Sequence, residues 1–182
     1  MRDERVQFSP RLFVIFVNFL QDVRLLLAGE VVDSNSIDAP GSVDHESLLK
    51  RIESFLAGNH SNSLATNQRL ALCSFFYLLV AVLGNRKQFT LKPFAVTVKT
   101  DLAISSGLGS SASYAVVLAG TFHTYAKYLS GINECFTLSD YDLKCVSKWA
   151  FDIERIMHGT PSGQKIEIAR GTRRLTERIL RR

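Results

Sequence analysis

The chain has 182 residues, of which 46% are hydrophobic and 21% charged, and its formal net charge is +5. This length and composition suit one globular domain with a sizeable core and exclude a chain that is disordered throughout. The positive charge is confined to residues 165–182, which hold seven of the 22 basic residues and two of the 17 acidic ones. Because the rest of the chain is neutral, we interpret this tail as a solvated end and expect no nucleic acid and no membrane as a partner.

The first apolar run of the chain covers residues 12–20 and is interrupted only by Asn18. The run is too short to span a bilayer. Acidic residues at positions 3 and 4 make a signal peptide the less favoured alternative, so we expect buried strands here. Three cysteines without CxxC spacing indicate reduced thiols and a cytoplasmic protein.

Two helices are predicted in the first half of the chain, after a loop at residues 33–44. Asp44 is a typical N-cap residue, and we expect the helix that follows it to end at Gly58. Residues 59–67 form a second polar loop. The next helix, residues 68–84, is apolar on nearly every face, which indicates a helix buried in the core rather than a membrane span.

The second half of the chain is predicted to begin with a strand at residues 94–100, where apolar and polar residues alternate. A helix follows at residues 111–129. The last helix begins at Ser139, where Asp142 completes a capping box, and ends near Met157. The pattern therefore combines strands with a helix-rich middle.

The segment ISSGLGSSASY, residues 104–114, lies between the predicted strand and the helix after it. The first N–H groups of a helix lack partners within the helix, and the helix dipole adds positive charge there. Glycines let a ligand approach the backbone, and a hydroxyl in the first turn can ligate Mg²⁺ beside phosphate oxygens. The segment therefore predicts a phosphate site. A small-residue turn that lets strand and helix pack closely explains the same spacing, and no lysine follows the second glycine as in a Walker loop.

A second segment that could carry chemistry is WAFDIERIMHGTPSG, residues 149–163. Glu154 borders the apolar stripe of its predicted helix, where its carboxylate could face a cleft. The alternative is an ordinary surface glutamate that pairs with Lys148 or Arg155. For His158 the pattern favours a helix C-cap over the role of a base.

Together, these two segments resemble the mevalonate kinase family, within the superfamily of galactokinases, homoserine kinases, mevalonate kinases and phosphomevalonate kinases. SSGLGSSA resembles its central phosphate-binding loop, and the run of Glu-Arg, His-Gly and Pro-Ser-Gly narrows the resemblance to mevalonate kinases. The resemblance implies an α+β fold, the N-terminal domain of the superfamily kinase fold, with a mixed sheet and helices packed on one face. It also implies ATP-dependent phosphorylation of mevalonate to 5-phosphomevalonate, a step of isoprenoid and sterol precursor synthesis.

The resemblance also implies roles for individual residues. Backbone N–H groups of the loop would bind the phosphates of ATP, and Ser111 and Glu154 would hold Mg²⁺ between them. His158, Ser162 and Gly163 would lie beside mevalonate. The loop residues are Ser105, Ser106, Gly107, Leu108, Gly109, Ser110 and Ser111.

Some features depart from the family pattern. The position of the catalytic aspartate holds Lys165, which cannot accept a proton as a carboxylate would, so no catalytic residue is assigned. Nothing from Lys165 onward resembles the family, whose C-terminal domain is missing, and the first family motif is missing as well. We therefore predict an incomplete N-terminal kinase domain at residues 1–164, a basic tail at residues 165–182, and a chain that is weakly active or inactive.

Two other functions stay open at this point. One is a non-catalytic, nucleotide-binding short form that associates with full-length enzyme, or with itself as a homodimer, through the apolar surface that a missing domain would leave. The other is a different small-alcohol kinase of the same superfamily. The run HGTPSG at residues 158–163 argues against that second alternative.

Overall fold

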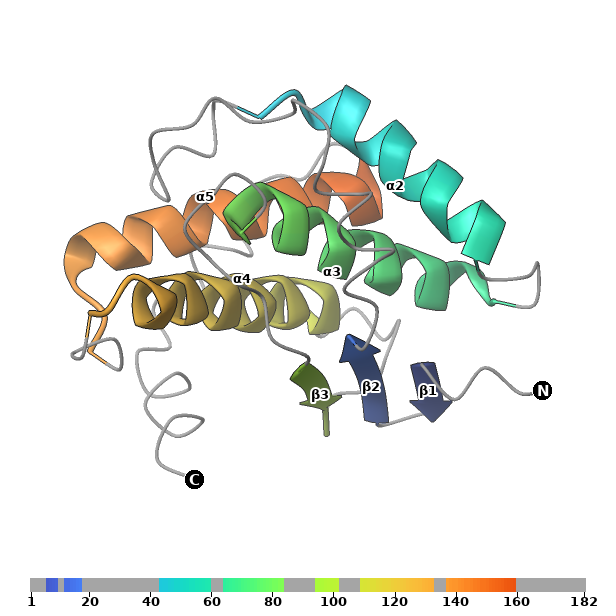
Figure 1. Ribbon diagram of the computed structural model, residues 1–182. Coiled ribbons are helices and arrows are strands. Elements are labelled where there is room, and N and C mark those ends of the chain that lie inside the picture. The colour runs from blue at the N-terminus through green and yellow to red at the C-terminus, as the bar shows by residue number, and fades with distance from the viewer. Residues whose placement is uncertain are drawn as a thin grey trace.

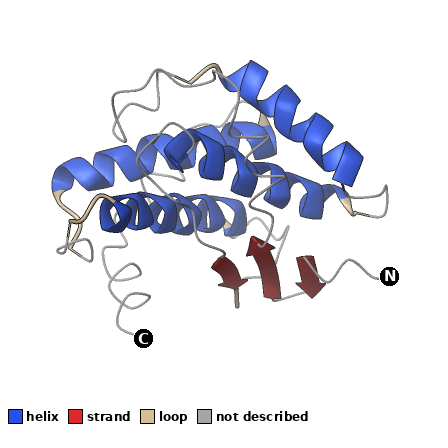
Figure 2. Ribbon diagram, in the orientation of Figure 1, coloured by secondary structure: helices blue, strands red, loops and turns tan. Residues whose placement is uncertain are grey.

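The computed structural model describes residues 6–9, 12–17, 43–59, 64–83, 94–101, 109–132 and 137–159. Within these ranges, helices form one layer and strands form another (Figures 1 and 2). The elements in chain order are β1 (Val6–Ser9), β2 (Leu12–Val17), α2 (His45–Asn59), α3 (Thr66–Leu83), β3 (Phe94–Lys99), α4 (Ser110–Leu129) and α5 (Asp140–His158).

The described strands form an antiparallel sheet in the order β1-β2-β3, with the described helices on one side of it (Figure 1). Leu12 of β2 lies opposite Ser9 of β1 on one side and Lys99 of β3 on the other. Val96 and Val98 of β3 are half-buried against the helical core, as the alternating pattern predicted. The strand predicted in the first apolar run is confirmed as β2. Both described strand pairs are antiparallel, so the mixed sheet is not confirmed within these residues.

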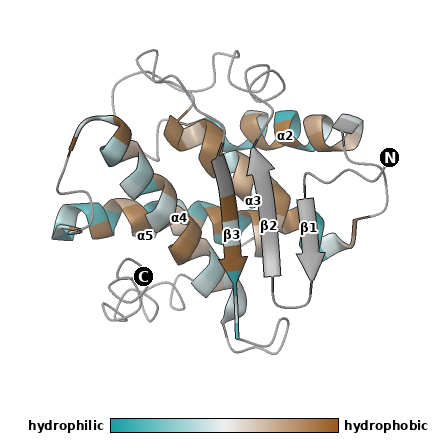
Figure 3. Ribbon diagram, turned by 60° about the horizontal axis from the view of Figure 1, so that its bottom comes forward, coloured by the Kyte–Doolittle hydropathy of each residue, from teal (hydrophilic) through white to brown (hydrophobic). Residues whose placement is uncertain are grey.

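Helix α3 is the centre of the core, because every residue from Leu72 to Leu83 is buried. It packs against α2, α4 and α5, and Figure 3 shows the helices behind the strands, with hydrophilic and hydrophobic residues on both α2 and α5. Phe75 of α3 meets Phe122 of α4 edge-to-face, with ring centroids 5.4 Å apart. Among the described residues, α3 alone has the length and hydropathy to cross a membrane, but two thirds of it is buried inside the structure. The predicted core helix is therefore confirmed.

Side-chain caps fix the starts of two helices at the predicted residues. Asp44 accepts hydrogen bonds from the backbone N–H and the hydroxyl of Ser47, at 3.2 and 2.7 Å, and these bonds lower the pKa of its carboxyl group. The predicted capping box is present before α5, where Ser139 and Asp142 each accept a hydrogen bond from the backbone of the other. The predicted end at Gly58 is one residue short, since α2 continues to Asn59.

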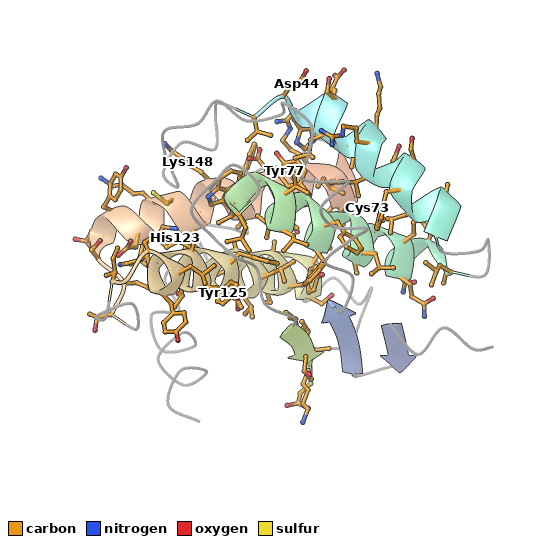
Figure 4. All side chains as sticks on the ribbon, viewed as in Figure 1. Asp44, Cys73, Tyr77, His123, Tyr125 and Lys148 are labelled. Atoms are coloured by element: carbon orange, nitrogen blue, oxygen red, sulfur yellow. The ribbon has the colours of Figure 1, made fainter. Side chains whose placement is uncertain are left out.

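Helices α4 and α5 run antiparallel, because the end of α4 contacts the start of α5 and the start of α4 contacts the end of α5. At the first of these contacts, Asp142 accepts hydrogen bonds from Lys127 and from the buried ring of His123, each at 2.8 Å (His123 is labelled in Figure 4). The second contact brings Ser111 of α4 to His158 of α5. The antiparallel packing thus places the start of α4, which follows the predicted phosphate loop, beside the last turn of α5.

Candidate active site at the start of helix α4

The first turn of α4 has the properties of an anion site. Gly109, just before it, has φ 79° and ψ 25°, a left-handed conformation that favours glycine. Its carbonyl oxygen accepts the first bond of the helix, from the N–H of Ser113 at 2.9 Å. No described side chain caps this helix start, and its first turn contains no acidic residue. Among the described residues, no side chain competes with a negatively charged ligand for the first N–H groups and the positive end of the helix dipole.

Glu154 supplies a carboxylate close to this helix start. It lies on α5 and is only 3% exposed, so the interpretation as a surface glutamate paired with Lys148 or Arg155 is wrong. Arg155 instead lies 3.6 Å from Asp152, and Lys148 is exposed. The Oε1 atom of Glu154 has no hydrogen-bond partner among the described residues. A buried carboxylate oxygen without a partner is costly, and a bound cation or donor would remove that cost.

His158 joins Glu154 to the start of α4. Its Nε2 atom forms a 3.0 Å hydrogen bond with Oγ of Ser111 and lies 4.0 Å from Oε2 of Glu154. Glu154 and His158 are four residues apart on α5, so their side chains share one face of the helix. The helix C-cap is Gly159 and not His158, because the N–H of Gly159 donates to the carbonyl of Arg155 at 2.8 Å. The predicted residues Ser111, Glu154 and His158 thus come together at one place.

These side chains fit Mg²⁺ that arrives with a nucleotide. Mg²⁺ usually binds one or two carboxylates and completes its shell with water and phosphate oxygens. Within the described ranges, no group of three or more histidine, cysteine, aspartate or glutamate side chains could hold a metal ion by itself. The site instead offers one carboxylate with an unpartnered oxygen and one hydroxyl, beside a helix start that attracts phosphate. That set suits a cation whose remaining ligands come from phosphate and water.

Ser110, another predicted phosphate-binding residue, is the first residue of α4. The remaining predicted site residues and the lysine at the family's aspartate position lie outside the described residues. They are Ser105, Ser106, Gly107 and Leu108 of the phosphate loop, Ser162 and Gly163 of the substrate segment, and Lys165. Their roles stay predictions. The contact between Ser111 and His158 was not predicted, because the two residues are 47 positions apart and meet only when α4 and α5 pack.

A second polar group lies on α5 close to Glu154. Burial raises the pKa of Asp152 to about 6, although the nearby Arg155 opposes the shift. The hydroxyl of Tyr77 and Nδ1 of His45 form a 3.2 Å hydrogen bond (Tyr77 is labelled in Figure 4), and the charge of Asp152 adds to the burial that raises the pKa of Tyr77. Asp152 is thus a half-buried acid with a charged neighbour, whereas the buried Glu154 has an oxygen without a partner among the described residues.

Comparison with known proteins places this site in a family. The model of the GHMP kinases N terminal domain matches residues 74–167, which is more than half of the chain. The chain belongs to the GHMP kinase family. The matched region includes α4, α5 and every residue of the candidate site, so the family resemblance found in the two sequence segments is confirmed.

Several GHMP kinase relatives share the name mevalonate kinase. The chain is 39% identical to mevalonate kinase of Mus musculus over 110 residues, 58% of this chain. It is 37% identical to mevalonate kinase of Homo sapiens over 103 residues, 54% of this chain. It is 31% identical to mevalonate kinase of Dictyostelium discoideum over 151 residues, 75% of this chain. The matches span 27%, 26% and 37% of those proteins, so this chain covers between about a quarter and just over a third of their length.

Proposed function

We propose that this chain is a mevalonate kinase-like protein that binds Mg·ATP at the start of α4 and serves the phosphorylation of mevalonate to 5-phosphomevalonate. The observation that carries the proposal is the buried carboxylate of Glu154, whose Oε1 has no partner among the described residues, beside an uncapped helix start. Its relatives named mevalonate kinase support the choice of substrate. The cytoplasm, where ATP is abundant and thiols stay reduced, is the proposed location.

The proposed site binds ATP through backbone and side chains together. Backbone N–H groups of residues 105–111 would contact the phosphates, and Ser111 and Glu154 would hold Mg²⁺ beside the β- and γ-phosphates. The ion would neutralise charge on the phosphates. In the reaction, the primary hydroxyl oxygen of mevalonate forms a bond to the γ-phosphorus, the bond to the β-phosphate oxygen of ATP breaks, ADP leaves and the hydroxyl proton is released. Phosphoryl transfer of this kind depends mainly on positioning and charge neutralisation.

Lys165 favours a second candidate function for the chain itself. It stands where the family resemblance expects the aspartate that accepts the substrate proton. Without a carboxylate there, turnover would be slow or absent, and the chain would act as a nucleotide-binding form that associates with full-length mevalonate kinase or with itself. Nucleotide binding is common to both candidates, so it is the property to measure first.

The first experiment measures the affinity of the 182-residue chain for ATP by calorimetry, in Mg²⁺ and in EDTA. We expect ATP to bind more tightly in Mg²⁺ than in EDTA. We expect Glu154→Gln to lower this ratio of affinities at least ~10-fold, because a neutral amide is a poor Mg²⁺ ligand. The matched control is Glu53→Gln, which changes an exposed glutamate of α2. Failure of the wild-type chain to bind ATP, or equal Mg²⁺ gains in wild type and Glu154→Gln, would contradict the proposal.

A second experiment separates the candidate functions. Radiolabelled ATP is incubated with the chain and with mevalonate or homoserine, and the labelled product is measured. Label transferred to mevalonate supports the kinase, and label transferred to homoserine identifies a different small-alcohol kinase. No transfer, together with Mg·ATP binding and co-elution with full-length mevalonate kinase, supports the non-catalytic form.

A further inference from the structure

We infer that His158 is a positioning residue for the Ser111 hydroxyl. Its Nε2 accepts a hydrogen bond from that hydroxyl, which leaves the lone pairs of Oγ free to bind a cation that Glu154 also binds. The inference rests on the proposed function, since it concerns the same Mg·ATP site. It gives His158 a role in nucleotide binding. The family resemblance predicts a contact with mevalonate for this residue. The contact that carries it is the 3.0 Å hydrogen bond between Nε2 and Oγ.

A serine hydroxyl is a weak and mobile metal ligand unless its proton is held elsewhere. The hydroxyl has one donor hydrogen and two lone pairs, and it rotates freely about its bond to carbon. When the hydrogen points toward a cation, the lone pairs cannot reach the ion. An acceptor within hydrogen-bond distance fixes the rotation, and Nε2 of His158 is the acceptor that the structure places there. The result is a hydroxyl already oriented for binding, which lowers the cost of ordering the site.

The geometry around His158 favours Ser111 over Glu154 as its partner. A distance of 3.0 Å is that of a hydrogen bond, whereas the 4.0 Å between Nε2 and Oε2 of Glu154 is too long for one. The ring therefore acts on the hydroxyl, while Oε1 of the carboxylate has no partner among the described residues. The side chain of His158 is 53% exposed, and its backbone belongs to the last turn of α5, which Gly159 closes. The inference requires the tautomer in which Nδ1 carries the proton and Nε2 does not.

The binding test compares His158→Ala with His158→Gln, whose amide oxygen can also accept the hydroxyl proton. We expect His158→Ala to weaken ATP binding ~3–10-fold in Mg²⁺ and to leave binding in EDTA unchanged, as suits the loss of one hydrogen bond. We expect His158→Gln to stay within about twofold of wild type in both buffers. A merely structural role would lower both affinities together, and thermal unfolding of each variant checks that it folds.

Other outcomes of the binding test overturn the inference in distinguishable ways. Unchanged Mg·ATP affinity in His158→Ala, with wild type binding normally, overturns the positioning role alone and leaves the proposed function intact. If that variant also loses affinity for mevalonate, His158 is a substrate contact instead. Failure of the wild-type chain to bind ATP in either buffer overturns both the inference and the proposed function.

The tautomer test needs no ligand. Nitrogen NMR of the chain labelled in its histidines, at about pH 8 where imidazole is ordinarily neutral, reports which ring nitrogen of His158 carries the proton. We expect Nε2 to be unprotonated in wild type, and we expect its resonance to shift in Ser111→Ala, which removes the donor. A protonated Nε2, or a spectrum that Ser111→Ala leaves unchanged, overturns the inference.

Discussion

The two ends of the α4–α5 pair each hold a buried carboxylate, but in opposite circumstances. At one end, Asp142 accepts hydrogen bonds on both oxygens, from His123 on Oδ1 and from Lys127 and Ser139 on Oδ2. At the other end, Glu154 is also buried but leaves Oε1 without a partner among the described residues. We call the first the closed end and the second the open end.

This difference separates stability from function. At the closed end, burial alone would raise the pKa of Asp142. The hydrogen bonds from His123, Lys127 and Ser139 together have the larger effect and lower that pKa below its ordinary value. The ionised carboxylate therefore stabilises the fold at neutral pH. At the open end, no described residue offsets the cost of burying Oε1 of Glu154, and a bound ligand can offset it. The contacts of Asp142 thus hold α4 and α5 together at one end, and the candidate binding site lies at the other end of the same two helices.

The largest expected effect is on stability at the closed end. Asp142→Ala removes the carboxylate half of the capping box of α5 and leaves the buried ring of His123 and the ammonium of Lys127 without their acceptor, so it should lower the free energy of unfolding by about 3–5 kcal/mol. Glu154→Gln at the open end should change it by less than about 1 kcal/mol, because Oε1 has no hydrogen-bond partner among the described residues that the substitution could remove. Urea unfolding of both variants measures the contrast. Equal losses would show that Glu154 is a structural residue and would end the distinction between the two ends.

The next effect concerns pH, and it comes from Asp152 on α5. Burial raises the pKa of this carboxyl group from 3.8 to about 6, so the folded chain binds its proton more tightly than the unfolded chain. The stability that this proton provides is present below about pH 4 and is lost as the pH rises through about 6. Asp152→Asn should therefore be more stable than wild type by roughly 1–3 kcal/mol at pH 7 and nearly equal to it at pH 4.

Unfolding in urea at several pH values, for wild type and Asp152→Asn side by side, tests this prediction. The difference between the two proteins removes the contribution of other groups, such as His45, whose pKa burial lowers. A constant difference across the pH range would mean that Asp152 is ionised in the folded chain with an ordinary pKa. Glu154→Gln in the same series shows whether the open end contributes to the pH dependence.

Local patterns were enough to predict most of the described elements. The caps at Asp44 and Ser139 depend on residues three positions away, so a short stretch of sequence contains all the information that they need. The apolar composition of α3 likewise indicates burial from every side. The end of helix α2 was predicted less accurately than its start. The helix continues one residue beyond Gly58, because a glycine with ordinary helical φ does not force a helix to end.

The candidate site was predicted only in parts. Ser111 and Glu154 were identified separately, each from its own segment and from the family resemblance. Their relation through His158 depends on the antiparallel packing of α4 and α5, which no short pattern encodes. The closed end was missed for the same reason: Asp142 was recognised as a cap of its own helix, but its bond to His123 comes from the neighbouring helix.

A moderate effect on stability is expected from two glycines, one at each end of the pair. Gly109 precedes α4 at the open end and Gly131 follows it at the closed end, and both have positive φ, 79° and 78°. A Cβ at either position would meet nothing within 4 Å among the described residues, so we expect alanine there to cost backbone strain, about 1–2 kcal/mol in each case. This makes the two substitutions a matched pair for stability.

Function should separate these two variants. Gly109→Ala strains the backbone at the helix start that we propose to bind phosphate, so it should weaken Mg·ATP binding by roughly tenfold, whereas Gly131→Ala should leave it unchanged. Calorimetry on both variants, below their unfolding temperatures, makes the comparison. If Gly131→Ala weakened binding as much as Gly109→Ala, the nucleotide affinity would follow global stability. The proposal that the start of α4 binds phosphate would then lose its support. If only Gly109→Ala weakens binding, the backbone at the start of α4 takes part in the site independently of the Glu154 carboxylate.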